Sequence, residues 1–354
     1  MKYTTQEGYL NIPYIMDNDP SVFKFIIGGR GTGKTFGILK YMVDKSRQTG
    51  QKFIYMRRTQ TQVDMLKSPD LNPFLALENE LGPSYRLLIK SINKSMSGVY
   101  EGEYVEKKQL YIPKGNPLGY IMALSTVANL RGMSAADVTD IFYDEFCPEK
   151  HEKPIQHEGR AFLNMIETFG RNRELAGRDP LKVVCASNSE NLANPLFIQL
   201  QFVTPCEKAL KKGYTHIDLP DQKASIYLLG QTEISRLKKT TSLYQLAGED
   251  SEFSKMSLEN EFTSDDMGLV RSEPLREYNP LAKLGEIVIY KHKSKRLWYV
   301  THHLSGSPDV YDSSDVDIKR FADRFYYLKL SHLNRHIIFE TYMDQVLFEK
   351  YMKI

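Results

Sequence analysis

The sequence has few of the features that mark secreted, membrane-spanning or strongly charged proteins. Its 354 residues include only three cysteines, which are scattered and form no C-x-x-C pair: Cys147, Cys185 and Cys206. So few isolated cysteines exclude a disulfide framework and suit a reducing cytoplasm. The first ten residues are polar, and no apolar run approaches the roughly 18 residues of a membrane span. The sequence therefore predicts neither secretion by a signal peptide nor a membrane partner.

Net charge is also small. The 47 Lys and Arg residues nearly balance the 44 Asp and Glu residues, which leaves a formal charge of +3. This balance excludes a histone-like polycation, although local basic patches can still bind nucleic acid. Hydrophobic residues make up 41% of the chain and charged residues 26%, which is ordinary for a globular protein. At about 150 residues per domain, the length predicts about two domains.

A glycine-rich loop stands between a predicted strand, residues 22–27, and a predicted helix, residues 34–48. The loop and the start of the helix match G-x-x-x-x-G-K-[ST] with Gly28, Gly29, Arg30, Gly31, Thr32, Gly33, Lys34 and Thr35. In such a loop, backbone N–H groups surround a polyphosphate, the lysine reaches the β- and γ-phosphates, and the hydroxyl binds Mg²⁺. The plain alternative is a glycine-rich turn with a chance lysine. The flanking strand and helix favour the nucleotide site.

Two adjacent carboxylates, Asp144 and Glu145, end a second apolar predicted strand. In a protein with a phosphate-binding loop, the first holds Mg²⁺ through water and the second activates the attacking water. Adjacent strand residues point to opposite faces, so the two can serve one site only where the chain bends. The alternative is a pair of solvated acids. An Asp-Glu pair is typical of the additional-strand ATPases, and no N-K-x-D guanine-reading motif is found, so we expect ATP as the substrate.

The predicted strands alternate with helical or loop-like stretches, which indicates a mostly parallel α/β sheet. Besides the first, they span residues 52–56, 120–124, 138–143 and 182–186. Asn188 follows the last of them and is a candidate sensor of the γ-phosphate, although residues 187–195 are also rich in turn formers.

We expect an ATPase domain at 1–204, a basic linker or lid at 205–269 and a small domain at 270–354. The last has a predicted hairpin at 287–300 and helical patterns near 315–327 and 337–352.

Several arginines are candidates for an arginine finger, a residue that stabilises transition-state charge on a neighbouring subunit. Arg171 follows an apolar helical run, where it can also merely complement the helix dipole. Arg131 precedes the acidic strand and is a second candidate. Arg57 and Arg58 are a third pair, and both can equally be solvated.

Together these residues resemble the DNA-packaging ATPases of φ29-type tailed phages, which are relatives of the large terminases. The similar stretches are residues 25–34, 53–58, 143–146, 171–174, 187–188, 194–195 and 256–260. They cover the first 200 residues well, the expected linker in patches and the last 80 residues weakly. The phosphate loop alone is shared by many families, whereas the combination is much more specific.

The resemblance implies a homomeric ring, pentameric in this family, that docks on the portal of an empty capsid in the host cytoplasm. The ring uses ATP and Mg²⁺ to drive double-stranded DNA inward, and it is not expected in the mature virion. Some such motors also use a structural RNA. The resemblance assigns Arg171 as the finger acting in trans, and Arg131 as a basic residue that also acts across the subunit boundary.

The resemblance further implies that the carboxy-terminal domain is a small α+β, RNase H-like nuclease domain without its metal-binding acids. Four aspartates there are expected to form a solvated loop: Asp309, Asp312, Asp315 and Asp317. Contacts with DNA phosphates are expected from a basic turn at 291–296 and from Lys208, Lys211 and Lys212. The alternative is that these residues are ordinary solvated surface.

Other functions that fit the sequence are a helicase or other translocase, a non-catalytic nucleotide-gated scaffold and a terminase with an active nuclease.

Overall fold

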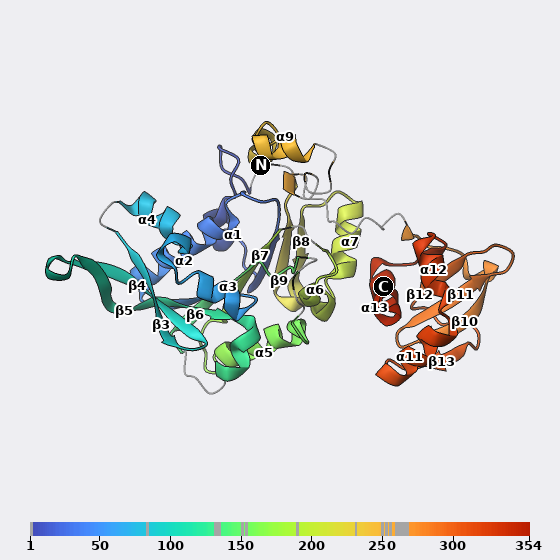
Figure 1. Cartoon of the computed structure of the whole chain (residues 1–354). Helices are drawn as coiled ribbons and strands as arrows, with labels where there is room; N and C mark the ends of the chain where they lie inside the picture. The colour runs from blue at the N-terminus through green and yellow to red at the C-terminus, as the bar shows by residue number, and fades with distance from the viewer. Residues whose placement is uncertain are drawn as a thin grey trace. The chain divides into compact units, whose positions relative to one another are not determined.

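A computed structural model describes most of the chain: residues 3–82, 85–130, 136–149, 152, 155–188, 191–230, 232–248, 251, 254, 257–258 and 269–354. Arg131 lies outside these described residues. The chain divides into two compact units, Met1–Leu200 with Ala209–Thr263 and Gln201–Lys208 with Ser264–Ile354 (Figure 1). Within the described ranges, no helix is both long and apolar enough to cross a membrane.

The first unit is built on a nine-stranded sheet in the order β3-β4-β5-β2-β6-β7-β1-β9-β8. Its strands are β1 Phe23–Ile27, β2 Lys52–Arg57, β3 Leu87–Asn93, β4 Met96–Val105, β5 Leu110–Ala123, β6 Val138–Asp144, β7 Lys182–Ser187, β8 His216–Leu219 and β9 Ala224–Leu228. In this spatial order, the six neighbouring strands β5-β2-β6-β7-β1-β9 all pair in parallel, which confirms the predicted mostly parallel sheet. β7 lies between the strand before the glycine loop and the strand that ends in Asp144, as an additional-strand ATPase requires.

Helices flank the sheet on both faces. They are α1 Ile12–Asn18, α2 Lys34–Thr49, α3 Gln60–Met65, α4 Leu75–Leu81, α5 Glu158–Gly170, α6 Pro195–Leu200, α8 Glu233–Lys238 and α9 Ser242–Ala247. Most of α7, Val203–Lys211, belongs to the second unit. Short 3₁₀ turns lie between helices or strands at Pro69–Leu71, Glu106–Lys108, Leu124–Leu130 and Pro220–Gln222.

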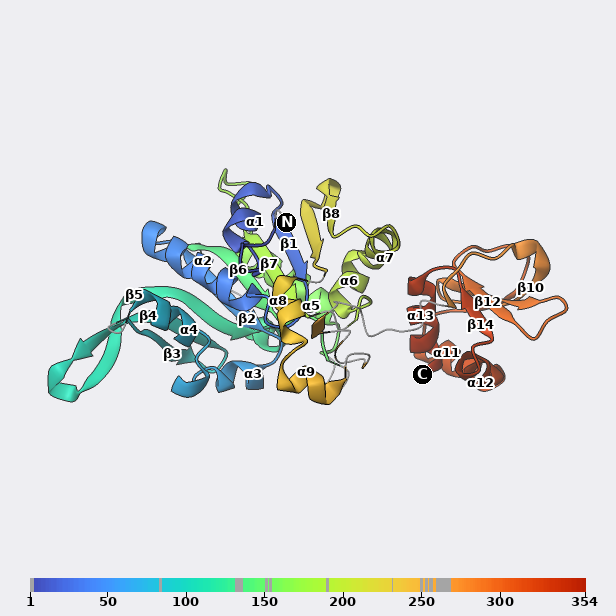
Figure 2. The same cartoon turned by 90° about the horizontal axis from the view of Figure 1, so that it is seen from above.

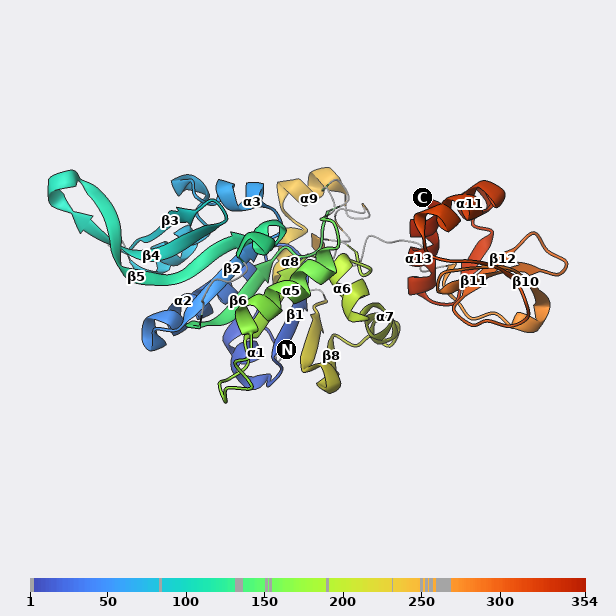
Figure 3. The ribbon, with the colours of Figure 1, turned by 90° about the horizontal axis from the view of Figure 1, so that it is seen from below.

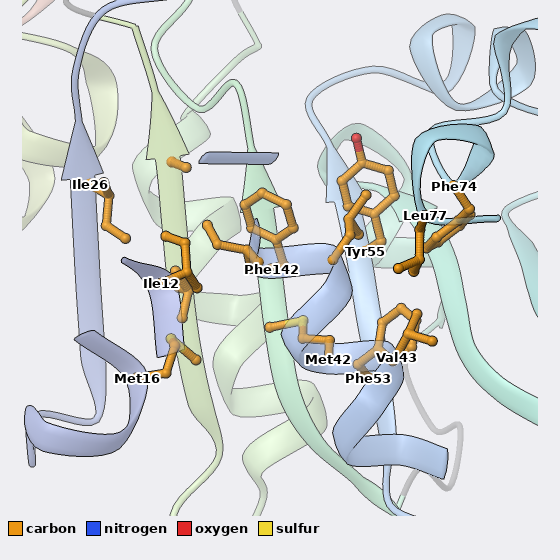
Figure 4. Packing of buried hydrophobic residues seen from close by; sticks show 14 of the residues in the cluster. Ile12, Met16, Ile26, Met42, Val43, Phe53, Tyr55, Phe74, Leu77 and Phe142 are labelled. Carbon is orange, nitrogen blue, oxygen red and sulfur yellow. The ribbon is translucent and has the colours of Figure 1, made fainter. Parts of the chain in front are cut away.

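The two faces bury different side chains because neighbouring strand residues point to opposite sides. Ile26 and Phe142 belong to an apolar cluster that includes residues of α1 and α2 (Figure 4). Phe25 and Tyr143 instead contact the ring of Phe162 on α5. α5 and α6 lie side by side on this second face (Figure 3). Full burial of each large apolar side chain stabilises the fold by about 1.5–3 kcal/mol.

Residues 96–123 form a long hairpin, β4–β5, that projects from the rest of the unit (Figures 1 and 2). The sequence predicted only short alternating segments there. Its outer half is exposed on both faces, so the two-residue alternation that identifies a half-buried strand is missing.

The region expected to be a basic linker or lid, residues 205–269, is in part a component of the large sheet. β9 pairs in parallel with β1 and is buried at all five positions, and β8 forms the edge beside it. The many lysines obscured this strand because they lie on exposed helix ends and turns. The first unit therefore continues well beyond residue 204.

The second unit contains a mixed five-stranded sheet in the order β13-β10-β11-β12-β14. Its elements are a 3₁₀ turn at Leu275–Glu277, β10 Tyr278–Leu284, β11 Ile287–His292, β12 Trp298–Thr301, β13 Asp309–Tyr311, α11 Asp315–Arg324, α12 Tyr327–Leu333, β14 Ile337–Phe339 and α13 Tyr342–Met352. The predicted hairpin is β11–β12, and the last predicted helix is preceded by the short buried strand β14. These elements agree with the predicted small α+β domain; the likeness to a nuclease stays a prediction.

The four aspartates expected in one loop have different settings. Asp309 lies on β13, with its carboxylate 2.9 Å from Arg324. Asp315 and Asp317 lie in the first turn of α11, where carboxylates complement the helix dipole. Asp312 lies between the strand and the helix. The expected loop is thus a strand end and a helix start.

Candidate active site

The glycine loop joins the end of β1 to the start of α2 in the conformation that phosphate binding requires. Gly31 and Gly33 have φ angles of +74° and +86°, a region that only glycine adopts readily. Gly33 also begins α2, and no side chain caps this end of the helix. The N–H groups of the first turn are therefore available to an anion, and the helix dipole favours one there.

Lys34 is buried and curls back over the loop. Its Nζ donates to the carbonyl oxygens of Gly28 at 2.7 Å and Gly29 at 2.8 Å, and to Oδ1 of Asn188 at 3.3 Å. Burial lowers the pKa of this ammonium to about 8, while the charges of Glu145 and Asp144 act against the shift. The lysine thus lies beside two carboxylates and can exchange loop carbonyls for phosphate oxygens.

Asp144 is buried at the end of β6 and accepts hydrogen bonds from three residues, one on α2 and two on β2. Thr35 Oγ1 lies 3.1 and 3.2 Å from its two oxygens, the Tyr55 hydroxyl is 2.9 Å from Oδ2, and Arg57 Nη1 is 3.0 Å from Oδ2. A hydroxyl and a carboxylate side by side are the oxygen ligands that Mg²⁺ takes in such sites. These residues therefore fit a Mg²⁺ ion. Arg57 is paired here, and the solvated alternative for it is wrong.

Glu145 stands where the chain bends after β6. Its φ is +54°, which is unusual for a residue other than glycine, and its N–H donates to Ala186 O at 2.8 Å. The bend turns the carboxylate towards Asn188, with 3.4 Å between Oε2 and Nδ2. Burial, and then the charge of Asp144, raise the pKa of Glu145 to about 7, against the effects of Arg57 and Lys34. A carboxylate with this pKa can accept a proton near neutral pH.

Asn188 connects these two charged groups. Its side chain is buried just beyond β7, and its amide accepts from Lys34 and donates to Glu145. A cavity of about 590 Å³ is lined by the loop and by Arg57, Glu145 and Asn188. The predicted loop, acidic pair and candidate sensor therefore meet at one edge of the sheet, where β1, β6 and β7 end.

Arg30, Thr32 and Lys238 complete the loop region. Arg30 Nη2 lies 2.6 Å from Glu149 Oε1, and Thr32 Oγ1 donates to Gly29 O at 3.1 Å. Lys238, on α8, donates to Arg30 O at 2.6 Å. The sequence did not indicate a role for Lys238, because this lysine stands in the stretch predicted to be a linker. Its spacing from the motif carries no signal that could have identified it.

A second cavity, of about 1040 Å³, adjoins the first and shares Gly31, Gly33 and Phe36 with it. Tyr9, Leu10 and Pro13 contribute apolar surface from the amino-terminal segment. Leu10 N–H donates to Thr32 O at 3.0 Å, which ties this segment to the loop. Aromatic and aliphatic walls beside a phosphate loop suit a flat heterocyclic base.

Arg58 is fully buried and forms ion pairs inside the first unit. Its guanidinium makes two bonds to the Glu158 carboxylate, at 2.7 and 2.9 Å, and a third to Glu152. The Tyr143 hydroxyl donates to the same Glu158 at 3.0 Å. This network ties the ends of β2 and β6 to the start of α5, so Arg58 is neither solvated nor placed as a finger.

The two arginines after α5 differ. Arg173 is buried and donates to Val138 O at 2.6 Å, which holds the start of β6. Arg171 is exposed, has a φ of +43° and is not among the residues that line the cavity around Lys34. The structure thus separates the run into a buried arginine with a structural contact and an exposed one. The basic residues of the 291–296 turn, Lys208, Lys211 and Lys212 are also exposed.

The strand, the glycine loop and the helix, with β7 inserted beside an Asp-Glu strand end, define the class of additional-strand P-loop proteins. Within it, the chain belongs to the Podovirus DNA encapsidation protein (Gp16) family, which matches residues 8–299. This confirms the resemblance inferred from the sequence.

Two curated relatives are DNA packaging proteins of Bacillus phages. The protein of phage B103 is 25% identical over 286 residues, which are 80% of this chain and 76% of that protein. The protein of phage phi29 is 26% identical over 246 residues, which are 69% of this chain and 63% of that protein. The match thus spans less than two thirds of the phi29 protein.

Two solved structures share the fold along nearly the whole chain. The bacteriophage Phi-29 viral genome packaging motor assembly gives a TM-score of 0.67 at 18% identity, covering 98% of this chain and 99% of that one. The Phi-28 gp11 DNA packaging motor gives 0.62 at 16% identity, covering 97% of each chain.

Proposed function

We propose that this chain is the ATP-hydrolysing subunit of a phage DNA-packaging motor. The observation that carries the proposal is the meeting of Lys34, Glu145 and Asn188 around one cavity at the end of three parallel strands, with Asp144 hydrogen-bonded to the cavity residue Thr35. Membership of the encapsidation family supports DNA as the cargo. The 3.3–3.4 Å contacts from Asn188 to Lys34 and Glu145 bring a phosphate-binding group and a proton acceptor to the same side chain.

The loop and its surroundings bind ATP. Lys34 and the first-turn N–H groups of α2 bind the β- and γ-phosphates, and the base enters the cavity between Tyr9 and Phe36. Thr35 and Asp144 would hold Mg²⁺, which when bound neutralises charge on the phosphates. Arg57 and Tyr55 orient the Asp144 carboxylate through their hydrogen bonds to Oδ2.

Glu145 is the general base. It accepts a proton from the water that attacks the γ-phosphorus, while the bond from this phosphorus to the bridging oxygen breaks and ADP leaves with the electron pair. Asn188 orients Glu145 and contacts the departing phosphate. General-base catalysis of this kind contributes about 10² to 10⁴ in rate.

Arg171 acts in trans. It is exposed at the end of α5 and does not line the cavity of its own chain, which suits a group that completes a neighbour's site. We carry over Arg131 as a second trans-acting residue from the family resemblance. A closed homomeric ring, with five subunits by the same resemblance, gives every site such a neighbour.

The ring docks on the portal of an empty capsid in the host cytoplasm and moves double-stranded DNA inward, with or without a structural RNA. It leaves before the virion is complete. The exposed lysines of the 291–296 turn and of the end of α7 are candidate phosphate contacts. We expect no nuclease activity, so plasmid DNA with Mg²⁺ or Mn²⁺ should stay intact.

The proposal is tested with the variant Glu145→Gln. It should bind ATP as the wild type does, because the amide keeps the shape of the side chain, while steady-state hydrolysis falls by at least about 10². Glu103→Gln makes the same chemical change at an exposed site on β4 and should hydrolyse ATP normally. Undiminished turnover in Glu145→Gln would remove the general base from the proposal.

The packaging role is tested with purified empty capsids. Wild-type protein with ATP should protect added double-stranded DNA from nuclease digestion, and Glu145→Gln should not. Separation of the two strands without protection would instead support a helicase.

A further inference from the structure

A cluster of imidazoles and carboxylates lies in the second unit, at the edge of the sheet where two parallel strands end. His302 and His303 directly follow β12, and Glu340 follows its neighbour β14. Glu340 N–H donates to Val300 O at 2.9 Å, which fixes the two strand ends side by side. Figure 2 shows both strands beside α13, whose first turn contributes Asp344. Four residues with metal-ligating atoms thus converge from three elements.

The distances between these atoms are too long for hydrogen bonds and close to those between the ligands of one metal ion. His303 Nε2 lies 3.6 Å from Glu340 Oε2, and His302 Nδ1 lies 3.8 Å from the same oxygen and 3.7 Å from Asp344 Oδ1. Tetrahedral ligands at about 2.0–2.2 Å from a zinc ion are about 3.3–3.6 Å from one another. The ligating atoms of His302, His303 and Glu340 all lie within 4.8 Å of one another, and Asp344 neighbours this group through His302.

Asp344 supplies an independent indication. Its side chain is 3% exposed, and Oδ2 accepts from Thr341 N–H and Oγ1 at 3.0 and 2.7 Å. Oδ1 makes no hydrogen bond to any described residue and faces His302. A buried carboxylate is stabilised by a nearby cation, and within the described residues the ion-pair partners of Asp344 and Glu340 are imidazoles, with no lysine or arginine among them.

The surrounding bonds hold the ligands in place. Thr301 Oγ1 donates to Glu340 Oε2 and accepts from His303 N–H, so one hydroxyl links two of the ligating residues. The imidazole rings of His302 and His303 are 4.1 Å apart between centroids and more than half exposed. An ion can therefore reach the cluster from solvent.

We propose that His302, His303, Glu340 and Asp344 bind one divalent transition-metal ion, with Zn²⁺ the best match. Two imidazoles and two carboxylates suit Zn²⁺, Co²⁺ or Ni²⁺, whereas Mg²⁺ prefers six oxygen ligands. The ion fastens the ends of β12 and β14 to the start of α13, so its role is to stabilise the second unit. Within the described residues, His302, His303 and Glu340 are the group of three potential metal ligands whose atoms lie within 4.8 Å of one another, and they belong to the second unit.

Zinc binding to the full-length protein, first stripped with a chelator, tests the proposal by calorimetry. The wild type should bind one Zn²⁺ per chain, and His302→Ala and His303→Ala should each weaken binding by at least about tenfold. His157→Ala removes an exposed histidine of the first unit and should change nothing. A double variant, His302→Ala/His303→Ala, that binds zinc as tightly as the wild type would overturn the site, as would displacement of zinc by a tenfold excess of Mg²⁺.

A second measurement uses the single tryptophan of the chain, Trp298, which lies on β12. Its fluorescence follows unfolding of the second unit in urea. Zinc should raise the midpoint of this transition in the wild type, because it binds the folded form. The double variant should keep its midpoint with and without zinc. An equal zinc-induced rise in both proteins would show that the ion binds elsewhere.

Discussion

The nucleotide site and the His302–Glu340 cluster both lie where parallel strands end, yet they balance charge in opposite ways. In the first unit, Asp144 and Glu145 face the side chains of Lys34 and Arg57, which are cations supplied by the chain. In the second unit, Glu340 faces imidazoles, which are neutral or charged according to their surroundings.

This difference bears on what each site can exchange. A lysine that donates to two loop carbonyls and an amide oxygen can exchange these contacts for phosphate oxygens. Where imidazoles surround a carboxylate, the negative charge of the carboxylate is balanced by a proton on an imidazole or by a bound metal ion. The first site therefore suits turnover of an anionic ligand, and the second suits lasting retention of a cation.

The strongest test of internal charge pairing in the first unit is Arg58→Leu. This change leaves the Glu158 carboxylate buried without its partner, which should destabilise the unit by about 3–5 kcal/mol. The double variant Arg58→Leu/Glu158→Leu should recover most of this loss, because no buried charge then remains.

Unfolding in urea resolves this effect by unit. Far-UV circular dichroism reports on both units, whereas fluorescence of Trp298 reports on the second. Arg58→Leu should lower the midpoint of the circular-dichroism transition and leave that of the fluorescence transition unchanged. A matching loss in the double variant would mean that packing, and not the ion pair, carries the effect.

Lys34→Met tests the same principle at the nucleotide. The variant removes the cation beside Glu145 and Asn188, so ATP hydrolysis should fall by about 10² to 10³, as for the loss of one well-placed donor. Lys90→Met alters an exposed lysine of β3 and should keep wild-type turnover. If Lys34→Met hydrolysed ATP normally, the contrast between a site with its own lysine and arginine cations and a site that needs a metal ion would lose its basis.

Much of the nucleotide site was predictable because the motif fixes the backbone. The loop, Asp144, Glu145 and Asn188 stand at strand ends, and parallel strands bring their ends to one edge. The bend at Glu145 was also expected, since adjacent strand residues cannot otherwise serve one site. The observed φ of +54° places that bend at Glu145 itself.

Other parts were not predictable, for identifiable reasons. Arg57 and Arg58 are adjacent in sequence, yet one faces the nucleotide cavity and the other a sealed ion pair, which depends on tertiary contacts with Asp144 and Glu158. β9 was hidden by neighbouring lysines. The His302–Glu340 cluster joins residues 38 positions apart through the pairing of β12 with β14, which no local pattern reports.

Substitution of Lys238 is expected to have the smallest and most selective effect, because this cation contacts the loop without contacting a carboxylate of the site. Its Nζ holds the Arg30 carbonyl beside Gly31, so Lys238→Gln should loosen the empty loop. A hydrogen bond of this kind is worth about 0.5–1.5 kcal/mol, so KM for ATP should rise by about two- to tenfold, with kcat nearly unchanged. Steady-state kinetics measures both, and Lys94→Gln, in the exposed turn after β3, is the control. A fall in kcat with an unchanged KM would instead place the Lys238 ammonium on the phosphate during hydrolysis. The first site would then use one more cation of the chain than the contacts in the empty site indicate.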